Sequence, residues 1–135
     1  MALIYVNIGS NLGDRQSLIF KAIDKISEEF GYYCLSEFVE SEPWGFNSTN
    51  RFLNIGMSFK SELHPEEILN RLQNIEKSIC SDPHRDSDGG YKDRKIDIDI
   101  MMIDNLTYSS ERLTVPHPHL QDRKFFLIPL QQLQP

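Results

Sequence analysis

The sequence is most informative at Arg94-Lys95-Ile96-Asp97-Ile98-Asp99-Ile100-Met101-Met102, where isoleucine and aspartate alternate behind a basic pair. A period of two predicts a β-strand, because successive side chains of a strand point to opposite faces. Asp97 and Asp99 are therefore expected to share one face, and the isoleucines the other. Two such carboxylates repel each other unless a cation lies between them, and Mg²⁺ takes oxygen ligands of this kind. The alternative is a half-buried strand with a polar face toward water, although aspartate is a poor strand former.

Outward from this strand, apolar periodicity and turn residues predict the order β-α-β-β-α-β. Asp14 is expected to cap the first helix, Gly31 to end it, and Pro65 to lie in the first turn of the second helix. The expected elements are strands at 3–8, 32–40, 51–61 and 94–103, helices at 15–30 and 64–79, a short edge strand from 107, mostly loop at 111–124, and a final apolar element from 125. This order predicts a ferredoxin-like α/β (α+β) fold, in which helices pack on a largely antiparallel sheet. Because that fold hosts many functions, the function has to be argued from the site.

Composition limits the class of protein. At 135 residues, 39% hydrophobic, the chain is expected to form a single domain over 1–135. The net charge of −6 argues against nucleic acid or an anionic membrane as a partner. The N-terminus lacks the pattern of a signal peptide, and no apolar stretch approaches the roughly 20 residues that span a membrane. Cys34 and Cys80 form no motif and are expected to be reduced thiols, so we expect a cytoplasmic protein.

A loop with aromatic residues precedes the third expected strand. Trp44 lies in a segment rich in turn residues, and Phe52 follows at the start of the strand. Such aromatics either fold over the core or form a wall for a flat ligand. Asn54 on the same strand favours the second interpretation, because a carboxamide offers both a donor and an acceptor, matching the mixed edge of a pterin or purine.

Two polar segments are candidates for the site, one on the expected second helix and one directly after it. Gln73 and Glu76 lie three residues apart on one helical face, where a solvated surface pair is the simplest interpretation. The segment 80–93 is long, polar and glycine-containing, and it carries His84, Arg85 and Lys92. Long loops of this kind in small domains are often active-site lids, and a plain connection is the alternative.

A proline-rich segment near the C-terminus carries basic residues. Arg112, His117 and Arg123 lie close together in sequence, and the prolines between them restrict the backbone. Guanidinium groups suit phosphate oxygens because their donor fork matches the geometry of the anion. His117 and His119 also suggest a transition-metal pair, which is a weak signal because no cysteine lies at ligand spacing.

Four blocks together resemble the 6-hydroxymethyl-7,8-dihydropterin pyrophosphokinase family of the folate pathway, and the resemblance covers essentially the whole chain. The blocks are Ile8-Gly9-Ser10-Asn11-Leu12-Gly13-Asp14, Phe52-Leu53-Asn54, Arg94-Lys95-Ile96-Asp97-Ile98-Asp99-Ile100-Met101 and Arg112-Leu113-Thr114-Val115-Pro116-His117. The last two, in this order, are specific in combination. The resemblance implies a ferredoxin-like fold and transfer of pyrophosphate from ATP to the hydroxymethyl group of the pterin, with release of AMP.

The resemblance also implies site residues at matching positions. Asp97 and Asp99 would hold two Mg²⁺ ions against the triphosphate of ATP, the co-substrate. The nucleotide-side positions are Gln73, Glu76, Ile100, Arg112, Leu113, Thr114, His117 and Arg123. The pterin-side positions are Ser41, Trp44, Phe52, Asn54 and Phe125, with Phe125 as the expected stacking partner.

The chain departs from the family pattern between the second helix and the acidic strand. Family members commonly carry a Gly-Arg pair and then a Trp-x-Pro-Arg run in this region. Here Arg85 is the candidate to replace the arginine of the Gly-Arg pair, from a shifted position. Tyr91 is the candidate to replace the tryptophan as an aromatic cover over the substrate. Arg94 matches a family arginine on the loop that closes over ATP and is counted with Arg85 among the expected catalytic residues. The chain also stops soon after Leu130, so a C-terminal region found in many relatives is expected to be missing.

Two other interpretations stay open at this level. The altered 80–93 segment is compatible with a catalytically weak or inactive relative that still binds pterin or nucleotide. A ferredoxin-like protein with an ion site unrelated to pterins is the third interpretation. For the enzyme, ATP and a hydroxymethyl dihydropterin are the expected partners, and we expect a monomer.

Overall fold

The centre of the fold is an antiparallel sheet, and a computed structural model describes it through residues 1–42, 50–80 and 95–134. The strand order is β2 (Tyr33–Leu35), β4 (Phe52–Ser61), β1 (Ala2–Ser10) and β5 (Asp97–Ile103), and β3 (Val39–Ser41) also pairs with β4. Every pairing in this sheet is antiparallel. This arrangement confirms the predicted ferredoxin-like fold, in which helices pack on a largely antiparallel sheet.

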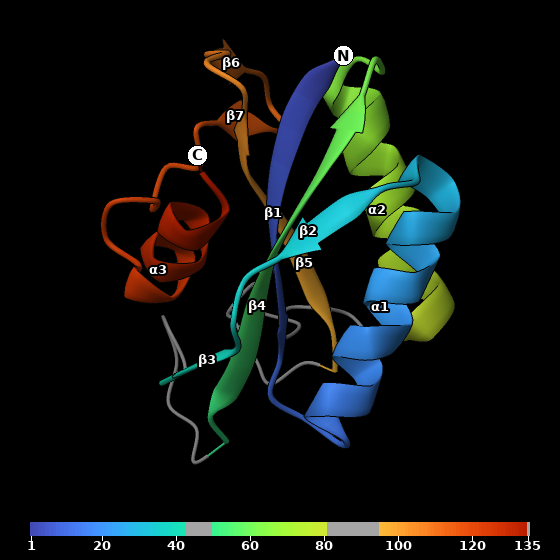
Figure 1. Cartoon of the computed structure of the whole chain (residues 1–135), viewed down its shortest axis with the longest axis vertical. Helices are drawn as coiled ribbons and strands as arrows, with labels where there is room; N and C mark the ends of the chain where they lie inside the picture. Colours follow the sequence, from blue (N-terminus) through green and yellow to red (C-terminus); the bar gives the residue numbers. More distant parts are fainter. Residues whose placement is uncertain (43–49, 81–94, 135) are drawn as a thin grey trace.

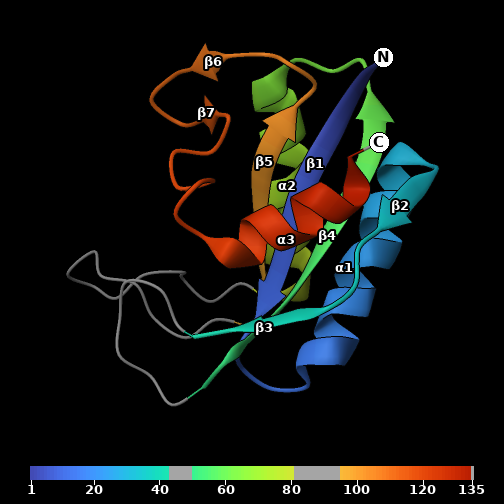
Figure 2. The same ribbon diagram turned by 60° about the vertical axis from the view of Figure 1, so that its left-hand side comes forward.

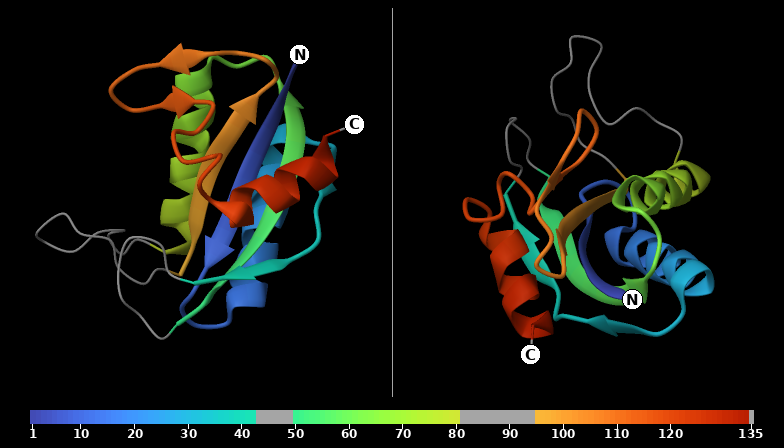
Figure 3. Two further views of the ribbon diagram at one scale, coloured as in Figure 1. Left: turned by 90° about the vertical axis from the view of Figure 1, so that its left-hand side faces the viewer. Right: turned by 90° about the horizontal axis from the view of Figure 1, so that it is seen from above.

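Helices cover both faces of the sheet. α1 (Arg15–Phe30) and α2 (Pro65–Ile79) lie on one face, and α3 (Lys124–Leu133) lies on the other, as Figures 1 and 3 show. The first two helices bury an isoleucine-rich stripe, which includes Ile19, Ile26 and Ile68, against the sheet. Since β1 is covered from both sides, its residues from Ile4 onward are buried without alternation.

The helix ends follow the predicted local signals. The Asp14 side chain accepts a hydrogen bond from the Ser17 amide at 3.1 Å and so caps α1. Gly31, with φ of 88°, ends that helix in a conformation that favours glycine. Pro65 lies in the first turn of α2, where its missing amide hydrogen is not needed.

α3 crosses directly over β4, in front of the sheet in Figure 2. A Cβ atom on Gly56 would lie 2.6 Å from the Pro129 Cβ and 3.0 Å from Leu133 Cδ1. Only glycine therefore permits this close approach. Beneath the helix lies a second apolar cluster, made by Tyr5, Met101, Leu120, Phe126 and Leu130.

The prediction of one strand over 32–40 was wrong, because β2 and β3 are separate. Leu35 lies opposite Met57 whereas Val39 lies opposite Asn54, so this side carries one extra residue. The Gly56 amide donates to the Ser36 hydroxyl at 2.8 Å, and the Ser36 amide donates to the Gly56 carbonyl at 2.9 Å. The side chain of Ser36 thus interrupts the ladder and produces a β-bulge.

Two further details differ from the prediction, and the type of one element is now known. The acidic strand begins at Asp97, and the segment expected as loop contains β7 (Thr114–Val115), which pairs with β6 (Tyr108–Ser109). The final apolar element is the helix α3, which includes Pro129. Among the residues that the structure describes, none of the helices combines the length and apolarity that crossing a membrane requires.

Candidate functional site

Asp97 and Asp99 share one face of β5, as predicted, and both are half-buried, while Ile98 and Ile100 are buried on the other face. β5 is the edge strand, and its neighbour β1 places Gly9 opposite Asp97 and Asn7 opposite Asp99. The two carboxylates therefore lie where the sheet ends and a ligand has access.

Beside this edge lies a cleft of about 450 Å³ between α2, β5 and the segment 110–118. The cleft contains both aspartates and all but one of the predicted nucleotide-side residues. The predicted residues that line it are Gln73, Glu76, Asp97, Asp99, Ile100, Arg112, Leu113, Thr114 and His117. The tertiary structure thus brings residues from three separate segments into one place.

Arg112 is held against α2 by side chains of one helical stripe. Its Nη2 donates to Asn70 Oδ1 at 2.6 Å and to Gln73 Oε1 at 3.2 Å, and its Nη1 lies 3.7 Å from Glu66 Oε1. Residues 66, 70 and 73 repeat at helical spacing, so they present their polar ends to the same guanidinium. Arg112 also lines the cleft, so these contacts fix the position of a positive charge there.

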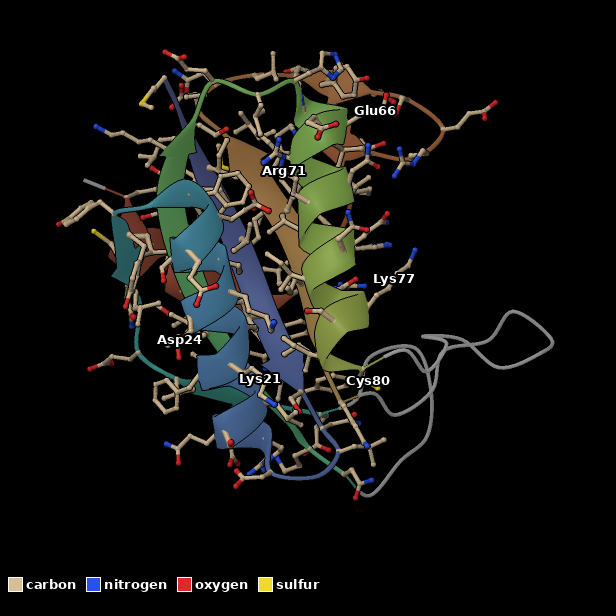
Figure 4. The ribbon with its side chains drawn as sticks, turned by 90° about the vertical axis from the view of Figure 1, so that its right-hand side faces the viewer. Lys21, Asp24, Glu66, Arg71, Lys77 and Cys80 are labelled. Atoms are coloured by element: carbon tan, nitrogen blue, oxygen red, sulfur yellow. The ribbon has the colours of Figure 1, made fainter. Side chains whose placement is uncertain are left out.

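The β6–β7 hairpin is attached to the N-terminal end of α2, where Figure 4 labels Glu66. The Tyr108 hydroxyl donates a hydrogen bond to the Glu66 carboxylate. This bond lowers the pKa of Glu66 and raises that of Tyr108, because it favours the ionised carboxylate and the protonated phenol. The contact fixes the strand that precedes Arg112 relative to α2.

Glu76 bonds to the acidic strand itself. Its side chain is 8% exposed, and its Oε2 accepts a hydrogen bond from the Ile98 amide at 2.6 Å. That amide lies between the two aspartates on the outer edge of the sheet. Glu76 therefore satisfies an edge donor of β5 at the floor of the cleft.

His117 lines the cleft, and hydrogen bonds fix both its backbone and its ring. Its backbone amide donates to the Met101 carbonyl at 3.0 Å, and its Nδ1 accepts from the His119 amide at 3.0 Å. Burial is the largest cause that lowers the pKa of His117 to about 4, and the Arg123 guanidinium adds to it. The neutral ring with an acceptor at Nδ1 must carry its hydrogen on Nε2, which makes Nε2 a donor at neutral pH.

The alternative of a transition-metal pair gains no support. His119 Nδ1 lies 3.3 Å from Asp122 Oδ2, and the rings of His117 and His119 are centred 6.0 Å apart. No group of three or more His, Cys, Asp or Glu side chains within 1–42, 50–80 and 95–134 is placed to hold a metal ion.

The predicted pterin-side residues on β3 and β4 form a hydrogen-bonded group. Asn54 Nδ2 donates to the Val39 carbonyl at 3.1 Å and to Ser41 Oγ at 2.9 Å, and its Oδ1 accepts from Asn7 Nδ2 at 3.2 Å. Phe52 is buried at the start of β4. The amide hydrogens of Asn54 are thus already engaged, which leaves its oxygen as the group with remaining capacity.

Two predicted residues lie at the start of α3. Phe125 is half-buried and packs edge-on against Phe126, with ring centroids 5.0 Å apart. The Arg123 guanidinium lies over the same two rings, 5.6 Å from the centroid of Phe125 and 4.9 Å from that of Phe126. Arg123 is not among the residues that line the cleft.

Four predicted residues, Trp44, Arg85, Tyr91 and Arg94, lie outside the described residues. Asn7, which was not among the residues predicted from sequence, is buried beside Asn54 and lies opposite Asp99 on the neighbouring strand. The available signal was a single amide residue inside the otherwise apolar strand Leu3–Ile8. A polar residue in a strand that both layers cover needs a partner or a function.

The whole sequence is similar to proteins of one family. A family model described as 7,8-dihydro-6-hydroxymethylpterin-pyrophosphokinase matches residues 5–135. A Porphyromonas gingivalis protein named 2-amino-4-hydroxy-6-hydroxymethyldihydropteridine pyrophosphokinase is 40% identical over 139 residues, which cover 100% of this chain and 92% of that protein. An Aquifex aeolicus protein of the same name is 38% identical over 100% of this chain and 82% of its own length. A Bacillus subtilis protein of that name is 29% identical, over 97% and 77% respectively.

Proposed function

The chain belongs to the 7,8-dihydro-6-hydroxymethylpterin-pyrophosphokinase family, and from this premise we propose that the cleft beside Asp97 and Asp99 is its active site. The protein is a pyrophosphokinase of folate biosynthesis, and this family uses ATP as the pyrophosphate donor. The acceptor is the hydroxymethyl group of the dihydropterin, and AMP leaves. An inactive relative and an unrelated ion-binding protein are not favoured, since relatives matched over 92% and 82% of their own length are named as the enzyme.

One observation carries the assignment of the site. The paired carboxylates open into the same cleft as the Arg112 guanidinium and the His117 imidazole. Phosphoryl transfer needs cations and hydrogen-bond donors around the phosphate oxygens, and little covalent chemistry from the protein. This cleft places both kinds of group within one volume.

The donor set fits magnesium. Mg²⁺ is usually bound by one or two carboxylates together with waters and substrate phosphates, so a full cage of protein ligands is not required. Asp97 and Asp99 supply two carboxylates on one face of a strand, and we assign them two Mg²⁺ ions. Bound there, the ions would neutralise the phosphate oxygens and align the attacking and leaving oxygens.

The protein's own residues then bind and orient the substrates. Arg112, which Asn70 and Gln73 hold at the cleft, binds phosphate oxygens through its guanidinium, and His117 donates from Nε2. Ser41, Phe52, Asn54 and Phe125 bind the pterin, as the family pattern indicates. No strong general base is required, because positioning and fixed charges can supply most of the acceleration.

The test is release of AMP from ATP in the presence of the pterin alcohol and Mg²⁺. Asp97→Ala and Asp99→Ala should each lower turnover by about 10³-fold or more, the scale on which removing a key electrostatic group acts, and leave pterin binding largely intact. Glu111→Ala is the matched control, because it removes an exposed carboxylate from the rim of the same cleft. Normal turnover in either aspartate variant would contradict the site.

Calorimetric titration separates the inactive relative from the enzyme. Both would bind ATP, and only the enzyme would release AMP when the pterin is added.

A further inference from the structure

Asn7 lies at the centre of β1, opposite Gly56 on one side and Asp99 on the other. Its side chain is 3% exposed. It shares a face of the sheet with Asn54 and Asp99, because residues two apart along a strand point the same way. Asn7 therefore stands between the proposed pterin side and the proposed metal side of the site.

A chain of hydrogen bonds determines how the Asn7 amide is oriented. The Val39 carbonyl can only accept, so Asn54 must turn its Nδ2 toward it, at 3.1 Å. The Oδ1 of Asn54 then faces Asn7. Because this oxygen accepts, Asn7 must donate to it from its own Nδ2, at 3.2 Å. The orientation of both amides thus follows from one backbone carbonyl, and reversing either amide would set two acceptors or two donors against each other.

This orientation leaves the oxygen of Asn7 without a donor. Its Oδ1 is buried and has no hydrogen-bond partner in the described part of the chain. Because the amide is planar, Oδ1 faces away from Asn54, and the residue opposite Asn7 on the other strand is Asp99. A buried acceptor beside a carboxylate needs a hydrogen-bond donor, and unsatisfied buried groups of this kind in native proteins often mark a function or a bound water.

We propose that Asn7 is a positioning residue that joins the two substrate sites. Its Nδ2 fixes the amide of Asn54 for the pterin, and its Oδ1 accepts a hydrogen bond from a water ligand of the Mg²⁺ held by Asp99. Mg²⁺ dehydrates reluctantly and keeps several waters, each of them a strong donor. The proposal rests on the proposed function, since it places the metal and the pterin on the two sides of Asn7.

Two substitutions separate the two contacts. Asn7→Ala removes both of them. Asn7→Asp has nearly the same shape and keeps an acceptor at the Oδ1 position, but it sets a carboxylate oxygen against the Asn54 Oδ1. Ser58→Ala is the matched control, because Ser58 is a buried polar residue on the same face of the sheet, opposite Tyr5 and farther along β4.

Two binding affinities are measured directly. Calorimetry gives the affinity for the pterin alcohol, and the paramagnetic resonance signal of Mn²⁺ gives the affinity for this ion in the presence of a non-hydrolysable ATP analogue. For Asn7→Ala we expect both affinities to fall about tenfold, the factor that loss of one ordinary hydrogen bond produces. For Asn7→Asp the pterin affinity should fall in the same way, whereas the Mn²⁺ affinity should not fall. Ser58→Ala should change neither affinity.

The proposal is overturned if Asn7→Ala binds both ligands as the wild type does, with only a lower melting temperature, because Asn7 would then be purely structural. It is also overturned if Asn7→Asp loses Mn²⁺ affinity as Asn7→Ala does. Should Asn7→Ala fail to fold, the split between pterin and Mn²⁺ affinity in Asn7→Asp still decides. The wild type reports on the proposed function separately, since that function fails only if the wild type binds no pterin or releases no AMP.

Discussion

The carboxylate of Glu76 and the backbone amide of Ile98 are joined by a buried hydrogen bond of 2.6 Å. This bond connects the last turns of α2 to the outer edge of β5, between Asp97 and Asp99. The resemblance to the family places Glu76 among the nucleotide-side residues, and the contact gives it a role that needs no nucleotide. Glu76 holds the backbone from which both aspartates project.

Replacing Glu76 should therefore cost both stability and turnover. Glu76→Ala leaves the Ile98 amide without its partner, so we expect unfolding by urea to require about 1–3 kcal/mol less free energy. Glu76→Gln keeps an acceptor oxygen and should lose less. The control is Lys77→Ala on the exposed side of the same helix, where Figure 4 labels Lys77. Equal stability of Glu76→Ala and wild type would show that the bond contributes nothing.

Gly56 should tolerate no side chain. In Gly56→Ala the added methyl would meet Pro129 at 2.6 Å, so α3 must shift or the strand must bend. Overpacking of this kind costs about 1–3 kcal/mol, which thermal unfolding followed by circular dichroism would detect. Lys60→Ala changes an exposed position of the same strand and should leave the melting temperature nearly unchanged. A Gly56→Ala variant as stable as Lys60→Ala would contradict the close packing of α3.

His117 should make stability depend on pH in a defined window. Its pKa of about 4 in the folded protein lies below the ordinary value of 6.5, so the unfolded chain binds the proton more readily. Folding stability therefore falls as the pH drops from about 6.5 toward 4, and the loss of stability that His117 causes is complete below both pKa values. Urea unfolding at pH 7 and pH 4.5 should show a larger loss for the wild type than for His117→Gln, which cannot titrate. An equal loss in both proteins would contradict the shifted pKa.

Arg112 should affect the nucleotide and not the pterin. Arg112→Ala removes a charge-assisted donor from the cleft, and we expect ATP affinity to fall about 10- to 100-fold, on the scale of such bonds. Arg71→Ala is the matched control, because Arg71 pairs with Glu29 at 2.7 Å between α1 and α2 and does not line the cleft. Calorimetric titration with ATP and with the pterin alcohol distinguishes the two substrates. If Arg71→Ala weakened ATP binding as much, the effect would be a general loss of positive charge.

Much of the fold was accessible from local pattern. The alternation around Asp97 and Asp99, the helical spacing of α1 and α2, and the signals at Asp14 and Gly31 were all confirmed. Each of these features depends only on residues within one turn or a few positions, so it can be predicted without knowing which residues lie across the sheet. The split of 32–40 into β2 and β3 escaped this reasoning, because it depends on Ser36 meeting Gly56.

The candidate site likewise has features that the sequence determines and contacts that only the tertiary structure determines. The amino-acid sequence alone determines that the chain carries paired carboxylates on one face of a strand and basic residues suited to phosphate. Only the folded structure shows that Glu76 reaches the Ile98 amide and that Asn7 meets Asn54 beside Asp99. These contacts join segments 22 and 47 residues apart. Hydrogen-bond partners at such separations are chosen by strand register and helix packing, which local periodicity does not encode.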